Sequence, residues 1–219
     1  MDMTSHSPVI AVLFDLDGTL VHSPIDFAAM KVAVRAIAAR HGVGDLTATD
    51  VLGLLTQASG RVAQADRVRF RDEAEAAILS EELRAAREVV AAPGAPEVLG
   101  RLRDAGKKIA VVTRNSRQIA RTVLADLALV HDVLVAREDT PRPKPAPIHL
   151  RRALVRLRVS PRNAVFVGDH AMDALGGRRA GMRTFGVPTP GDTTQAAFAA
   201  QRPDVMLEDL HALLAHLSI

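Results

Sequence analysis

Short apolar runs that end in polar residues recur along the chain. Residues 9–14 are all apolar, and the acidic turn Asp15-Leu-Asp-Gly18 follows them at once. A run that is apolar at every position, rather than at every second one, is typical of a buried strand in a parallel sheet. The same pattern predicts further strands at 108–113, 133–136 and 164–169, with shorter ones at 183–187 and 204–207.

Between these runs, apolar residues recur at the spacing of amphipathic helices. Ser116, for example, can cap a helix whose apolar face holds Ile119, Val123, Leu124 and Leu127. Strands that alternate with helices from about residue 92 onward predict a parallel sheet with helices on both faces. Besides the helix after Ser116, the expected helices cover 96–105, 147–158, 171–180 and 210–217.

Residues 21–91 interrupt this alternation. Apolar positions at helical spacing mark one helix near 27–38 and a second at 78–90, with no strand pattern between them. We therefore expect an all-helical insertion at 21–91. It would be placed after the first strand of an α/β core made of residues 1–20 and 92–219.

Composition narrows the class of protein. The 219 residues are 48% hydrophobic and 24% charged, which is ordinary for a globular protein and unlike a disordered one. The absence of cysteine excludes disulfides, thiolate catalysis and cysteine-based metal sites. The first eight residues lack the apolar segment of a signal peptide, and no stretch approaches the roughly 18 apolar residues of a membrane span. We therefore expect a cytoplasmic protein with no membrane partner.

The chain is mildly basic, with a formal net charge of +3, and its arginines gather around 61–71 and 151–158. There the arginines alternate with acidic and apolar residues, as on solvated helix faces. Phenylalanine supplies six aromatic side chains, while tyrosine and tryptophan supply none, so stacking surfaces for single-stranded nucleic acid are nearly lacking. We expect no nucleic-acid partner, and the sequence makes no prediction of the oligomeric state.

Polar residues stand near the C-terminal ends of four predicted strands, where ligands collect in an open parallel sheet. They are Asp15 and Asp17, Thr113, Lys144 in the loop after the third strand, and Asp169 with Asp173. Carboxylates that converge in one crevice repel one another unless a cation is present, and oxygen ligands favour Mg²⁺. A lysine and a hydroxyl beside that cation suit a phosphoryl group, whose oxygens need positive charge and hydrogen-bond donors.

These residues lie in four motifs that resemble those of the haloacid dehalogenase (HAD) superfamily, the aspartate-nucleophile phosphatases. In the family's order, the motifs are Phe14-Asp-Leu-Asp-Gly-Thr-Leu20, Val111-Val-Thr113, Arg142-Pro-Lys144-Pro-Ala-Pro147 and Val167-Gly-Asp169-His-Ala-Met-Asp173. The resemblance implies an α/β fold with a HAD-like Rossmannoid parallel sheet. The helical insertion resembles the α-helical cap of the phosphoglycolate phosphatase-like branch. The resemblance further implies Mg²⁺ as cofactor and a small phosphorylated metabolite as partner.

The resemblance also implies a role for each matching residue. Asp15 would be the nucleophile that forms an aspartyl-phosphate, and Asp17 the general acid and base whose backbone carbonyl also binds Mg²⁺. Thr113 and Lys144 would hold the phosphate. Asp169 would complete the metal site with Asp15 and Asp17. A second group would support these residues: Asp173, Gly18, Thr19, Arg114 and Asn115.

Three positions depart from the commonest pattern or have no clear role. Arg114 separates Thr113 from Asn115, where many relatives have asparagine directly after the threonine. Its side chain could reach an acidic substrate or only solvent. His22 stands where relatives often have Asp-Ser, and a hinge role is favoured over a contact with the leaving group. His170, which follows Asp169 within the fourth motif, is not expected to act in catalysis.

The expected function is Mg²⁺-dependent hydrolysis of a small organic phosphomonoester. A β-phosphoglucomutase-like phosphomutase keeps the same four motifs and stays an alternative. A non-catalytic binding protein of this fold would usually have lost Asp15 or Asp17. Haloacid dehalogenases lack the second aspartate, and phosphonate hydrolases use a cap lysine, for which the insertion offers only Lys31. Guanidinium groups that favour an acidic substrate such as phosphoglycolate are available at Arg114, Arg35, Arg40, Arg61 and Arg67.

Overall fold

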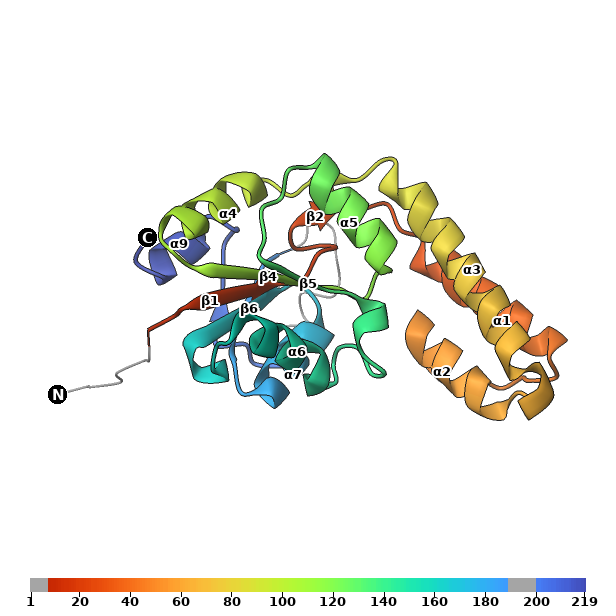
Figure 1. The fold of residues 1–219 in the computed structure, drawn as a ribbon. Helices are drawn as coiled ribbons and strands as arrows, with labels where there is room; N and C mark the ends of the chain where they lie inside the picture. Colours follow the sequence, from red (N-terminus) through yellow and green to blue (C-terminus); the bar gives the residue numbers. More distant parts are fainter. Residues whose placement is uncertain (1–7, 189–199) are drawn as a thin grey trace. The chain divides into compact units, whose positions relative to one another are not determined.

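The computed structural model describes residues 8–188 and 200–219. Residues 1–7, on which the expectation of no signal peptide largely rests, lie outside this range. The chain divides into two compact units. The core unit consists of Met1–Ser23 and Val89–Ile219, and the helical unit is Pro24–Glu88 (Figure 1).

A parallel sheet forms the centre of the core unit. Within the described residues it has six strands in the order β5-β4-β1-β6-β7-β8, and all neighbours pair in parallel. The side chains of β1 and β6 are buried throughout, as the unbroken apolar runs predict. The predicted α/β sheet is therefore confirmed. Its strands are β1 (Ala11–Phe14), β4 (Lys108–Val112), β5 (Val133–Val135), β6 (Ala164–Gly168), β7 (Arg183–Gly186) and β8 (Val205–Met206).

Helices cover both faces of this sheet. Figure 1 shows α4, α5 and α9 on one side and α6 and α7 on the other. Leu150, Ala153 and Leu154 of α6 pack against Leu13 and Ala110 of the sheet. The predicted cap at Ser116 is present, because its Oγ accepts a hydrogen bond from the Ile119 N–H at 3.4 Å. The helices are α4 (Ala95–Asp104), α5 (Arg117–Asp126), α6 (Pro147–Leu157), α7 (Ala171–Ala180) and α9 (Ala212–His216), with 3₁₀ turns η2 (Arg137–Asp139) and η3 (Pro161–Asn163).

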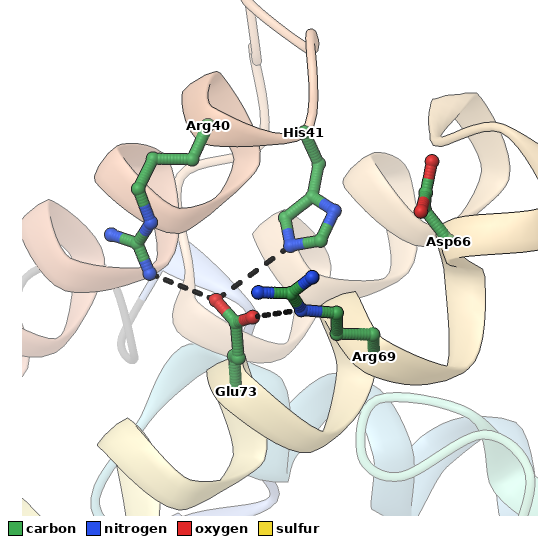
Figure 2. A pocket seen from close by; sticks show the side chains of 5 residues that line it. All are labelled: Arg40, His41, Asp66, Arg69 and Glu73. Atoms are coloured by element: carbon green, nitrogen blue, oxygen red, sulfur yellow. Dashed lines mark hydrogen bonds and ion pairs between the residues drawn. The ribbon is translucent and has the colours of Figure 1, made fainter.

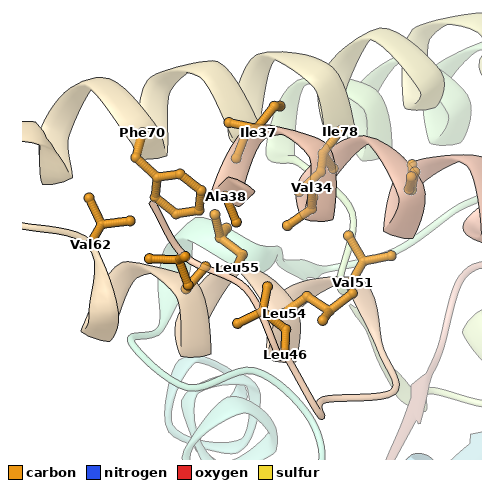
Figure 3. Packing of buried hydrophobic residues seen from close by; sticks show 14 residues of the cluster. Val34, Ile37, Ala38, Leu46, Val51, Leu54, Leu55, Val62, Phe70 and Ile78 are labelled. Atoms are coloured by element: carbon orange, nitrogen blue, oxygen red, sulfur yellow. The ribbon is translucent and has the colours of Figure 1, made fainter. Parts of the chain in front are cut away.

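The helical unit has a hydrophobic core of its own (Figure 3). Its elements are α1 (Phe27–Arg40), α2 (Val51–Arg61), η1 (Gln64–Asp66) and α3 (Arg67–Ala86). Val34 of α1, Leu54 of α2 and Phe70 of α3 are fully buried in this core. Among the described residues, no helix of either unit is long and apolar enough to cross a membrane.

The sequence did not predict α2. Gly53 and Gly60 lie within it, and glycine lowers helix propensity by about 1 kcal/mol relative to alanine. Two features stabilise the helix in the folded chain. Asp50 accepts a hydrogen bond from the Gly53 N–H at 3.1 Å, and Leu54 and Leu55 are buried against α1 and α3.

The ends of the insertion also differ from the expectation. The predicted helix at 78–90 overlaps the second half of the longer α3 and runs past its end, and Leu83 within it is 43% exposed. Val90, 56% exposed, belongs to a strand. This strand, β3 (Val90–Ala91), pairs antiparallel with β2 (Val21–His22) in the core unit. Strands of two residues are too short to leave a periodic signal in the sequence.

Candidate active site

The site begins at the central strand of the sheet. β1 lies between β4 and β6, and Phe14 is in register with Val111 on one side and Val167 on the other. All three strands run in parallel, so the residues that follow them leave the sheet at the same edge. Asp15, Thr113 and Asp169 are therefore brought together from three distant stretches of the chain.

Lys144 is the cation of this site. Its Nζ lies 2.6 Å from Asp15 Oδ1 and 2.8 Å from Asp173 Oδ1, and its side chain is 1% exposed. Burial opposes the charge of the ammonium group, but the carboxylates of Asp15 and Asp173 raise the pKa of Lys144 above its ordinary value. The structure thus pairs Lys144 with the residue predicted as nucleophile.

Three carboxylates converge beside Lys144. Among the described residues, Asp15, Asp169 and Asp173 offer oxygen atoms that lie within 4.8 Å of one another. Burial is the main cause that raises the pKa of Asp169 to about 8, and the charges of Asp173 and Asp15 add to it. Burial also raises the pKa of Asp15 to about 6, although Lys144 opposes this rise. A hard divalent cation prefers oxygen ligands, and its charge would offset the repulsion between these buried carboxylates. These residues therefore fit Mg²⁺.

Asp17 lies outside this carboxylate cluster. Its Oδ2 accepts a hydrogen bond from Asn115 Nδ2 at 2.6 Å, although the two residues are 98 positions apart in the chain. The metal site predicted from the sequence includes the backbone carbonyl of Asp17. The cluster described above consists of side-chain oxygens only, so it does not test that ligand. Asp173, expected in a supporting role, contributes the third carboxylate of this side-chain cluster.

Gly18 and Thr19 contact Asp169 closely. Thr19 Oγ1 donates a hydrogen bond to Asp169 Oδ1 at 3.0 Å. Gly18 has φ +80°, and a Cβ atom at this position would lie 2.1 Å from Asp169 Oδ2. Both the backbone conformation and the approach to the carboxylate therefore require glycine here.

The second motif also lies at this edge. Thr113 is buried, and its Oγ1 accepts a hydrogen bond from the Asn115 N–H at 3.1 Å, so its hydroxyl hydrogen can still be donated. Arg114 Nη1 lies 2.9 Å from the sulfur of Met172, at the start of α7. His170 is the N-cap of α7, where its Nδ1 accepts a hydrogen bond from the Met172 N–H. His22 is half-buried in β2.

Three of the arginines named as possible substrate contacts donate hydrogen bonds within the helical unit. Arg35 donates to the carbonyls of Leu46 and Ala48, Arg61 to that of Asp45, and Arg67 to that of Val62. Their guanidinium groups thus hold the connections between helices. These contacts weaken the expectation that they bind a substrate carboxylate.

Arg40, the other arginine of this unit named as a possible substrate contact, lines an open pocket on the helical unit (Figure 2). Arg40 and Arg69 donate to the carboxylate of Glu73 at 2.9 and 3.0 Å, and His41 Nε2 lies 3.6 Å from it. Asp66 is the fifth lining residue. Two arginines thus face two carboxylates, so the pocket offers no excess positive charge for an anionic ligand.

Sequence reasoning missed one buried polar residue near the site, His149 of α6. It lies five positions after Lys144, and its Nδ1 accepts a hydrogen bond from the Lys144 N–H at 3.1 Å. The only signal in the sequence is a histidine at an apolar position of the predicted helix.

Comparison with known proteins decides the family. A family model of haloacid dehalogenase-like hydrolases matches residues 10–181. The chain belongs to this family. The family resemblance seen in the four motifs is thus confirmed for most of the chain.

This HAD-like hydrolase is 35% identical over 120 residues to pyrophosphatase PpaX of Bacillus velezensis. The match covers 54% of this chain and 55% of that protein, so the chain spans about half the length of the curated relatives it matches. A crystal structure described as a predicted phosphoglycolate phosphatase of Haemophilus somnus aligns with TM-score 0.66 at 17% identity, covering 95% of this chain and 97% of that one. A HAD family hydrolase of Deinococcus radiodurans, with bound phosphate and sodium, aligns with TM-score 0.65 at 25% identity, covering 96% of each chain.

Proposed function

We propose that this HAD-like hydrolase removes a phosphate group from a small phosphorylated compound, with Asp15 as nucleophile and Mg²⁺ as cofactor. The observation that carries the proposal is the buried Lys144, whose ammonium group lies between Asp15 and Asp173 beside Asp169. A buried cation next to a carboxylate cluster provides both signs of charge that phosphoryl transfer needs. The phosphate bound to the Deinococcus relative is consistent with such a site.

The metal would be held by the carboxylates of Asp15 and Asp169 and by the backbone carbonyl of Asp17. Asp173 is already hydrogen-bonded to the His170 N–H and paired with Lys144, which suits a supporting role. When bound, Mg²⁺ would offset the negative charge of the carboxylates and of the phosphate oxygens.

In the first step, an Asp15 oxygen attacks phosphorus while the bond from phosphorus to the leaving oxygen breaks. Asp17 donates a proton to that leaving oxygen. Lys144 keeps Asp15 ionised through its 2.6 Å contact. The Thr113 hydroxyl donates to a phosphate oxygen. The product is an aspartyl-phosphate on Asp15 and the dephosphorylated leaving group.

In the second step, the Asp17 carboxylate takes a proton from a water molecule. The water oxygen attacks phosphorus, and the bond between phosphorus and Asp15 breaks to release inorganic phosphate. The hydrogen bond from Asn115 orients the Asp17 side chain in both steps. One residue thus serves as acid and then as base.

The substrate class has two candidates. The resemblance to the phosphoglycolate phosphatase-like branch favours a small organic phosphomonoester. The 35% identity to pyrophosphatase PpaX favours inorganic pyrophosphate as a second candidate. Both would use the phosphate-transfer residues in the same way, because the candidates differ only in the leaving group. A cytoplasmic location and the absence of a nucleic-acid partner stay predictions from the sequence.

The proposal is tested with purified protein on a panel that includes pyrophosphate, phosphoglycolate and hexose phosphates. We expect phosphate release that stops in EDTA and returns with Mg²⁺. Asp15→Asn should abolish it, and Asp17→Asn should slow it by about 10²- to 10⁴-fold, the usual range for general acid–base catalysis. Asp126→Asn, on the exposed face of α5, is the matched control and should match the wild type.

Two results would contradict the proposal. Phosphate release that continues unchanged in EDTA would show that no metal is required. Undiminished release by Asp15→Asn would show that Asp15 is not the nucleophile. If instead a hexose 1-phosphate is isomerised with its phosphate retained, the protein is a phosphomutase.

A further inference from the structure

His149 occupies an unusual place for a polar side chain. It is fully buried on α6, among residues that pack against the sheet. Because its Nδ1 accepts the Lys144 N–H, the ring proton belongs on the other nitrogen. That nitrogen, Nε2, lies 3.3 Å from the carbonyl oxygen of Ala136, which can only accept. Burial, with the nearby charge of Lys144, also lowers the pKa of His149 to about 3, so the ring is neutral.

Ala136, whose carbonyl lies against His149 Nε2, is itself held in place by hydrogen bonds. The Ala136 N–H donates to Asp139 Oδ2 at 2.7 Å. Asp139 also accepts a hydrogen bond from Arg156 Nη2 at 2.7 Å and pairs with Arg117. The segment that follows β5 is therefore attached to both α5 and α6, so Ala136 offers a fixed acceptor to His149.

His149 contacts the backbone N–H of Lys144, not the ammonium group of that lysine. A lysine side chain has a flexible four-carbon stem, so the position of its charge depends on how firmly both ends are held. Asp15 and Asp173 hold the Nζ end. His149 holds the backbone end. An apolar residue at 149 would leave a buried N–H without an acceptor, which is costly.

We propose that His149 is a positioning residue for Lys144: its contact with Ala136 keeps the ring proton on Nε2, so that Nδ1 accepts the Lys144 N–H and thereby fixes where the ammonium group meets Asp15. The effect of this hydrogen-bonded link, which we call the tie, on catalysis rests on the proposed function. The tie itself can be measured without any turnover.

Two amide substitutions separate the two ends of the imidazole. In His149→Asn the side-chain oxygen can take the place of Nδ1 and accept from Lys144. In His149→Gln the side-chain NH₂ can take the place of Nε2 and donate to Ala136, while the acceptor for Lys144 is lost. We expect His149→Asn to keep kcat within about threefold of wild type, and His149→Gln to lose roughly 10- to 100-fold, the scale of a small misplacement of a catalytic group.

A purely structural role gives a different pattern. Activity would then follow thermal stability, and two amide variants of equal Tm would have equal kcat. Equal activity of His149→Asn and His149→Gln would therefore overturn the proposal. His149→Phe, which fills the space without either polar contact, should lose at least as much activity as His149→Gln.

Nuclear magnetic resonance provides the measurement that needs no substrate. With ¹⁵N-labelled histidine, the His149 signals should show a proton on Nε2 and should not titrate between about pH 5 and 8, where an ordinary histidine changes charge. Amide exchange at Lys144 should be slow in the wild type and in His149→Asn, and faster in His149→Gln. A proton on Nδ1, or equal exchange in both variants, would overturn the proposal. A protein that hydrolyses nothing in the panel but passes this test would contradict the proposed function alone.

Discussion

Close contacts of individual residues set the geometry of the candidate site. Asp15, Asp169 and Asp173 gather around Lys144, and Asn115 reaches Asp17 from the end of the neighbouring strand. Asp15 is distant in sequence from Lys144, and Asp17 from Asn115, so these two contacts depend on the sheet. The close approach of Gly18 to Asp169 is the tightest of these constraints.

Gly18→Ala tests this constraint. A left-handed backbone costs a non-glycine residue about 1–2 kcal/mol, and the added methyl would also displace the Asp169 carboxylate. We expect lower stability, weaker Mg²⁺ binding and at least tenfold lower activity, measured by denaturant unfolding, calorimetry and turnover. Gly106→Ala is the matched control, because Gly106 has φ +69° and a Cβ atom there would meet no other atom within 4 Å. Equal activity of the two variants would contradict the assigned role of Gly18.

The segment after β5 shows how neighbouring elements are joined. Asp139 in η2 pairs with Arg117 of α5 and Arg156 of α6 and accepts the Ala136 N–H. Burial opposes its ionisation, but the hydrogen bonds from Arg156, Ala136 and Arg117 outweigh it and lower the pKa of Asp139 to about 2. Its charge therefore stabilises the folded core unit.

This stabilisation should disappear in acid. The pKa of Asp139 in the folded protein lies below its ordinary value of 3.8, so the contribution is complete above about pH 5 and is lost as pH falls toward about 2. We expect Asp139→Asn to cost about 1–3 kcal/mol at pH 7, typical of hydrogen bonds to a charged group, and much less at about pH 2.5. Denaturant unfolding of both proteins across this range measures it. A cost that does not change with pH would contradict the assignment, and Asp126→Asn should show no cost at any pH.

At the scale of the whole molecule, the chain is organised as two units with separate cores. The core of the helical unit draws only on residues between Ile25 and Ile78, while the sheet and α6 form a core in the other unit. All the candidate catalytic and metal-binding residues belong to the core unit. β2 and β3 pair at the two points where the chain leaves and re-enters that unit.

This organisation predicts that the core unit folds without the helical unit. His22 is in register with Val90, so replacing residues 24–88 by a short glycine-rich turn would close a hairpin of β2 and β3. We expect a folded protein that binds Mg²⁺ and hydrolyses phosphate esters with little preference among them. Circular dichroism, calorimetry and the substrate panel measure these properties. A folded deletion variant with the selectivity of the full chain would show that the helical unit does not select the substrate.

The sequence by itself determined the sheet and the set of residues at its edge. Short unbroken apolar runs that end in polar turns are typical of strands buried on both faces, and parallel strands bring their C-terminal ends to one edge. Asp15, Thr113 and Asp169 could therefore be predicted to meet from the order of residues along the chain. The helices of the core unit followed from the local spacing of apolar residues and from caps such as Ser116.

The tertiary structure decided what local pattern does not carry. α2 is stable despite its glycines because Leu54 and Leu55 are buried between α1 and α3. β2 and β3 form because the ends of a long insertion meet. The pairing of Asp17 with Asn115 and the tie from His149 to Lys144 join atoms across separate elements. Such contacts depend on how elements pack in space, and a periodic pattern along one element records only which of its faces is buried.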